Sequence, residues 1–139
     1  MENKVEHLKM IQEIIGRMAK NSFSVKSWNL TLVSGLIVYT LNENVTINHF
    51  AVISLVSAIV VVFCCLDAYY LMIEKSYRKY YSFVAAKKDG DIDFLMEFPP
   101  KDKENKKFLV SFWEPFRSPS IWLYYSFILL IPIILLLLI

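Results

Sequence analysis

Asp67 is the residue whose type and position could carry chemistry, because it is a carboxylate inside the apolar stretch VVVFCCLDAYYLMIEK (60–75). A carboxylate inside a membrane is costly, and it usually faces a partner, a cavity or water. Two roles follow for Asp67. It can hydrogen-bond a neighbouring helix, through a polar side chain or a tyrosine hydroxyl, or it can line a water-filled path or sense assembly.

Other chemistry-bearing residues do not combine into a known site. His7 and His49 are expected on opposite sides of a membrane, and Cys64 and Cys65 are adjacent in an apolar run. There is no Cys/His ligand spacing, phosphate loop or nucleophile motif. The carboxylates of DGDID (89–93) lack the other ligands of a calcium loop. We therefore expect no enzyme, no metal and no cofactor.

The elements that must position Asp67 are apolar blocks. The chain has 139 residues, is 56% hydrophobic and contains only 3 Gly. Its apolar residues are grouped in blocks instead of following a helix or strand period, which is typical of an integral membrane protein. Three blocks qualify as spans, over 27–41, 50–73 and 119–139. The last is free of charge and long enough, at 1.5 Å per residue, for a hydrocarbon core of about 30 Å.

The ends of two spans carry specific signals. Ser118 followed by Pro119 is a helix start, because Ser caps helices and Pro is tolerated in the first turn. The first span is short, and a snorkelling Lys26 can extend it.

The basic residues predict an orientation. All 15 Lys and Arg lie before the first span or between the second and third, and the loop at 42–49 has none. The positive-inside rule then places the N-terminus and the central segment in the cytoplasm, and the C-terminus outside. The net charge of +2 is too small to indicate a nucleic-acid duplex as partner.

The fold class that follows is an all-α integral membrane protein with three transmembrane helices. Residues 1–26 form a cytoplasmic amphipathic helix, which is either an interfacial anchor or an oligomerisation helix. Residues 27–73 form a two-span hairpin. Residues 74–118 form a cytoplasmic helix extension, unbroken before Asp89, plus a short β-hairpin. Residues 119–139 form the third span.

The hairpin is predicted from two stretches with alternating apolar residues, DIDFLMEF (91–98) and KKFLVSFW (106–113). A short helix over 91–98 is the main alternative.

Small residues on the first span favour close helix packing. Ser27, Thr31 and Gly35 recur at four-residue intervals with Ser34 beside them, and Ser57 offers a small polar position on the second span. Such a pattern lets helix backbones approach closely. It predicts helix association, within one chain or between copies.

Two stretches together carry a family resemblance. HLKMIQEIIGRMAKNSFSVKSW (7–28) leads an amphipathic helix into a span, and LDAYYLMIEKSYRKYY (66–81) leaves the next span as a basic, Tyr-rich helix. This layout resembles the small multi-span membrane effectors of bacterial anti-phage defence loci, the SLATT-like proteins and those found with CBASS and Pycsar systems. The chain differs from SLATT-type proteins in its third span, and it has no obvious nucleotide-binding domain.

The resemblance implies a bacterial inner-membrane protein that forms homo-oligomers and permeabilises the bilayer. A cytoplasmic sensor protein or a nucleotide second messenger would trigger it through residues 74–118. The candidate contacts for that ligand or partner are Arg78, Lys79, Lys87, Lys88 and Trp113. The alternatives are a non-lytic membrane anchor or regulatory subunit and, less well supported, a small transporter.

Overall fold

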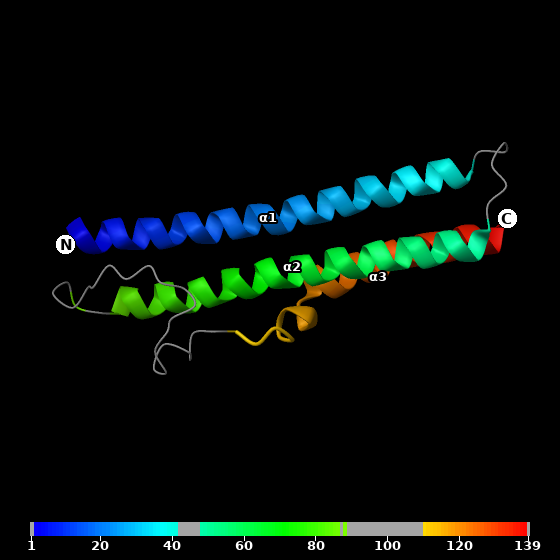
Figure 1. The fold of residues 1–139 in the computed structure, drawn as a ribbon. Coiled ribbons are helices and arrows are strands. Elements are labelled where there is room, and N and C mark those ends of the chain that lie inside the picture. The colour runs from blue at the N-terminus through cyan, green and yellow to red at the C-terminus, as the bar shows by residue number, and fades with distance from the viewer. Residues whose placement is uncertain (1, 42–47, 87, 89–109, 139) are drawn as a thin grey trace.

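The computed structural model describes residues 2–41, 48–86, 88 and 110–138 (Figure 1). Within these residues every regular element is helical, so the all-α prediction is confirmed for this part of the chain. The elements in order are α1 (Glu2–Thr40), α2 (His49–Ala86), the 3-10 helix η3 (Pro115–Arg117) and α3 (Pro119–Leu138).

The predicted β-hairpin is not shown. Most of it falls on residues 89–109, which lie outside the described residues. Of its second strand, residues 110 and 111 have no regular structure and residues 112–114 form a turn that leads into η3.

The amphipathic segment and the first apolar segment form one helix. α1 is 39 residues long and has no break at residue 26, where the predicted division lies. Two of its hydroxyl groups bond within the helix: Ser27 Oγ donates to Phe23 O (3.1 Å), and Thr31 Oγ1 donates to Ser27 O (2.9 Å). The chain contains no proline in this stretch that would interrupt it.

α2 is the one helix, among the described residues, that is long and apolar enough to cross a membrane. Only 17% of its most apolar window is buried against the rest of the chain. The apolar segment of α3, Pro119–Ile131, is shorter. α2 also continues without a break through its charged half to Ala86, as the absence of helix breakers predicts.

The three helices share one core at one end of the molecule. α1 and α2 run antiparallel, and α3 lies along the N-terminal half of α2 (Figure 1). The molecule is therefore a three-helix bundle in its apolar half and a helix pair in its charged half. The buried apolar core lies in the three-helix half and contains Val33, Val56, Val60, Ala68, Ile121, Tyr125 and Ile128.

The segment before α3 is attached to α2. The backbone N–H of Val110 donates to Ser76 Oγ (3.0 Å), and Ser76 Oγ donates to Met72 O (2.8 Å). Ser118 O then accepts from the N–H groups of Ile121 (3.0 Å) and Trp122 (3.2 Å). α3 thus begins at Pro119, where the sequence predicts its start.

Candidate functional site

Asp67 lies at the centre of a buried polar cluster that joins α1 to α2. Its side chain is completely buried, and Ser22 Oγ donates a hydrogen bond to Oδ1. The ammonium of Lys26 lies 2.5 Å from Oδ2 and also donates to Ser22 Oγ at 3.2 Å. Ser22, Lys26 and Asp67 are called the Asp67 cluster below. Asp67 therefore has the bond to a neighbouring helix that the first of its two predicted roles requires.

Two adjacent tyrosines connect α3 to the same level of the bundle. Tyr124 OH donates to Lys26 O in α1 (2.6 Å), and Tyr125 OH donates to Phe63 O in α2 (3.1 Å). Their rings lie edge to face with centroids 4.9 Å apart. All three helices are therefore connected within about one turn of the Asp67 cluster.

The Asp67 cluster lies where the charged helix pair becomes the apolar three-helix bundle. Lys26 keeps 17% of its side chain exposed, whereas Asp67 keeps none. The ammonium neutralises the carboxylate, so the bundle carries no isolated charge at this level. A buried ion pair contributes little net stability compared with apolar residues of the same shape, but removal of one partner typically costs about 3–5 kcal/mol.

Asn29 is a further buried polar residue, on the same face of α1 as Ser22 and Lys26. It is completely buried, and neither Nδ2 nor Oδ1 has a hydrogen-bond partner among the described residues. Residues three or four apart share a helix face, so residues 22, 26 and 29 form one polar row. An amide buried without a partner is costly, and so it calls for an explanation.

The sequence reasoning missed three of these residues. It treated Lys26 as a snorkelling residue and gave Ser22 and Asn29 no role. The sequence feature that could have identified them is their spacing, because three polar residues lie on one face of the helix where its apolar segment begins.

The small residues lie on the outside of the bundle. Ser27, Thr31, Ser34 and Gly35 are exposed, and a Cβ added to Gly35 would meet nothing within 4 Å. These four residues are called the small-residue stripe. Ser57 on α2 is half-buried. The structure therefore does not bring the stripe together with Asp67, and α1 uses its other face, with Asn29 and Val33, to pack within the chain.

The predicted ligand contacts are not gathered in one place. Arg78 forms an ion pair with Glu74, with Nε at 2.9 Å and Nη2 at 2.8 Å from Oε1. Lys79 and Lys88 are exposed, and Lys87 lies outside the described residues. Trp113 is 74% exposed and belongs to a different group, a cluster of aromatic rings with Phe112 and Phe116.

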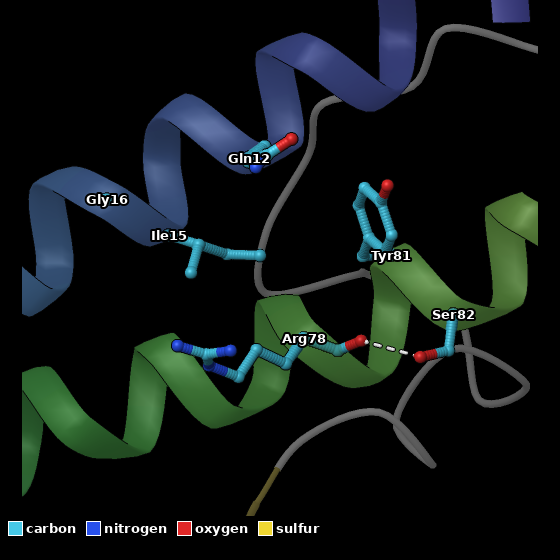
Figure 2. A pocket seen from close by; sticks show the side chains of 6 residues that line it. All are labelled: Gln12, Ile15, Gly16, Arg78, Tyr81 and Ser82. Carbon is cyan, nitrogen blue, oxygen red and sulfur yellow. Dashed lines mark hydrogen bonds between the residues drawn. The ribbon is translucent and has the colours of Figure 1, made fainter. Parts of the chain in front are cut away.

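A pocket of about 440 Å³ opens between the charged halves of α1 and α2. Figure 2 shows its walls, which present a guanidinium, a phenol, an amide and an aliphatic side chain toward the gap. Ser82 Oγ donates to Arg78 O (3.1 Å), so its proton is already used. The lining residues are Gln12, Ile15, Gly16, Arg78, Tyr81 and Ser82.

Tyr77 is a half-buried residue of the same charged half. Burial raises the pKa of its phenol, and the guanidinium of Arg17 lowers it by a smaller amount. The phenol is therefore protonated at neutral pH. Within the described residues no group of three or more His, Cys, Asp or Glu side chains could hold a metal ion.

Comparison with protein-family models, with curated proteins and with solved structures found no match for this chain.

Proposed function

We propose that this chain is an inner-membrane effector that oligomerises and permeabilises or depolarises the membrane when a cytoplasmic ligand or partner acts on it. The bilayer is the solvent of its apolar half. Its role in anti-phage defence is the expectation that the family resemblance supplies.

The observation that carries the proposal is the exposure of apolar side chains on all three helices. A core helix of a soluble protein is mostly buried, whereas only 17% of the apolar window of α2 is. Large exposed apolar surfaces in a soluble chain would be an aggregation hazard, and lipid removes that cost. Residues of this kind that are at least half exposed include Phe23, Trp28, Val38, Phe50, Val61, Val62, Leu123, Phe127 and Leu130.

The proposed topology has three crossings, by the C-terminal part of α1, the N-terminal part of α2, and α3. The three-helix half of the bundle then lies in the bilayer and the charged helix pair in the cytoplasm. Lys26 and Asp67 lie near the boundary, where an ion pair costs less than at the bilayer centre.

The small-residue stripe supports assembly between copies. It is exposed, it has open space over Gly35, and Ser27 and Thr31 satisfy their own hydroxyls. Another helix could therefore approach its backbone without leaving a donor unpaired. Assembly then uses one face of α1 and folding uses the other.

The pocket between α1 and α2 is the proposed site of the trigger. Its volume lies in the usual range for small-molecule sites. Residues from both helices line it, so an occupant with different affinities for two helix arrangements would shift the balance between them. Arg78 makes an anionic group the favoured chemistry for that occupant, although Glu74 already neutralises part of its charge.

The test is controlled expression in bacteria loaded with a membrane-potential dye, with and without phage infection. A three-span protein of unrelated function, at the same membrane level, is the control. We expect depolarisation with this chain and none with the control. No depolarisation in either condition, with the chain present in the membrane, would favour the non-lytic anchor or regulatory subunit instead.

A further inference from the structure

The polar row on α1 offers Asp67 more partners than it uses. Ser22 and Lys26 bind its two carboxylate oxygens. Asn29, one turn further along α1, is completely buried, and neither of its amide atoms has a partner in the part of the chain that the structure describes. Asp67 is the one acidic residue of the chain between Glu43 and Glu74. A carboxylate is an acceptor for the donors that all three residues carry.

We propose that α1 has two registers against α2, one helical turn apart, and that Asp67 exchanges partners between them. In the resting register, which the structure shows, Ser22 and Lys26 bind the carboxylate. In the shifted register Lys26 and Asn29 bind it. This inference rests on the proposed function, because the shift is the helix rearrangement that the effector needs.

The spacing of the row permits this exchange. One turn of α-helix is 5.4 Å, and residues three or four apart replace each other after a shift of one turn. Movement of α1 toward its N-terminal end brings Lys26 to the level of Ser22, and Asn29 to the level of Lys26. Shifts of one turn between packed elements are a known form of conformational switch.

The charges make the shift tolerable inside a membrane. Lys26 remains close enough to pair with Asp67 in both registers, so neither state exposes an isolated carboxylate to the apolar half. Ser22 loses its bond to Asp67 but moves toward the charged helix pair, where water can solvate it. Asn29 gains the acceptor that it lacks in the resting register.

α3 opposes the movement. Tyr124 OH binds Lys26 O at 2.6 Å, and this bond must break when α1 slides past α3. The resting register is therefore held by Ser22 and Tyr124, whereas the shifted register is held by Asn29.

Two substitutions should then have effects of opposite sign. Ser22→Ala removes a bond made only in the resting register, and Asn29→Leu removes a bond made only in the shifted register at nearly constant side-chain size. Loss of an average hydrogen bond between membrane helices changes the ratio of two populations, here the two registers, about threefold. We expect the depolarisation rate, at equal membrane level, to rise about threefold with Ser22→Ala and to fall about threefold with Asn29→Leu.

Ser54→Ala is the matched control, because Ser54 is exposed on α2 and belongs neither to the Asp67 cluster nor to the small-residue stripe. It should depolarise like the original chain. If Asn29→Leu depolarises as fast as the original chain, the proposal is wrong. The same conclusion follows if both substitutions change the rate in the same direction.

A distance measurement separates this inference from the proposed function. Spin labels at positions 20 and 79, both exposed, are placed on a chain in which Cys64 and Cys65 are replaced by Ala, in lipid nanodiscs. In the shifted register the distance should shorten by up to about 5 Å, one helical turn. We expect the fraction of molecules with the shorter distance to increase with Ser22→Ala and to decrease with Asn29→Leu.

The two measurements fail in different ways. Identical distance distributions in the two variants would overturn the two registers, whatever the dye reports. Distances that change as expected in a chain that never depolarises cells would support the registers and overturn the proposed effector function.

Discussion

At the scale of single residues, Asp67 shows how a carboxylate is accommodated in an apolar helix. It accepts from Ser22 and pairs with Lys26, both supplied by α1. Burial of an ion pair costs desolvation free energy, and the attraction between the two charges roughly offsets that cost without adding much stability. The pair therefore adds little net stability compared with apolar residues of the same shape.

Substitutions at the pair should separate charge from packing. Asp67→Asn keeps the shape but leaves the Lys26 ammonium without its counterion, so we expect a loss of about 3 kcal/mol in the free energy of unfolding. The double variant Lys26→Met/Asp67→Leu replaces both charges by apolar groups and should be about as stable as the original chain. Thermal unfolding in detergent, followed by circular dichroism, measures both variants. A double variant less stable than Asp67→Asn would show that the pair itself is strongly stabilising.

At the scale of elements, α1 has two faces with different tasks. Its inward face carries Ser22, Asn29 and Val33, all buried, and its outward face carries the small-residue stripe. α2 has no comparable division, because large side chains such as Phe50, Leu55 and Val61 stand among the small exposed residues of its apolar half.

The stripe predicts the effect of a bulky residue at position 35. Gly35→Leu has open space within the chain, so folding of one copy should be unaffected. It should weaken oligomers, because the added side chain separates backbones that small residues allow to touch. Chemical cross-linking in membranes measures the oligomers. Ala58→Leu, a similar enlargement at an exposed position of α2, is the control. Unchanged cross-linking with Gly35→Leu would show that the stripe faces lipid.

The attachment of α3 depends on two hydroxyl groups. Tyr124→Phe removes the bond to Lys26 O, and Tyr125→Phe removes the bond to Phe63 O. Each should cost about 0.6 kcal/mol, the average for hydrogen bonds between membrane helices. The two substitutions differ in function, because Tyr124 donates to α1 whereas Tyr125 donates to α2. We expect Tyr124→Phe to accelerate depolarisation and Tyr125→Phe to leave it nearly unchanged, as measured with the membrane-potential dye.

At the scale of the whole molecule, the bundle has an apolar half of three helices and a charged half of two. The described residues at the apolar end of α2 include Asn48, and those beyond its charged end include Lys88; both are exposed. If the apolar half lies in the bilayer, these two positions are on opposite sides of it.

Labelling of introduced cysteines tests this topology. In a chain in which Cys64 and Cys65 are replaced by Ala, Asn48→Cys should react with an impermeant thiol reagent added outside intact cells. Lys88→Cys should react only after the membrane is opened. The physical reason is the positive-inside rule, because the Lys and Arg residues are concentrated in the half that we expect in the cytoplasm. Equal labelling of both positions in intact cells would contradict three crossings in this orientation.

Local sequence was sufficient for the helical elements. The absence of helix breakers predicts the unbroken run of α2 to Ala86, and Ser118–Pro119 predicts the start of α3. These features depend on composition and spacing within a few turns of one helix. The same reasoning placed a boundary at residue 26 that α1 does not have, because a change of composition alone does not end a helix.

The partners of Asp67 were decided by tertiary structure. Ser22 lies 45 residues away in the sequence, and its meeting with Asp67 depends on the rotation and register of α1 against α2. The outward direction of the small-residue stripe depends on the same rotation. Periodicity shows which residues share a face of a helix, but the packing of the three helices determines which face turns inward. The sequence by itself therefore determined that Asp67 needed a partner, and the packing determined that the partners are Ser22 and Lys26, with Asn29 next in the row.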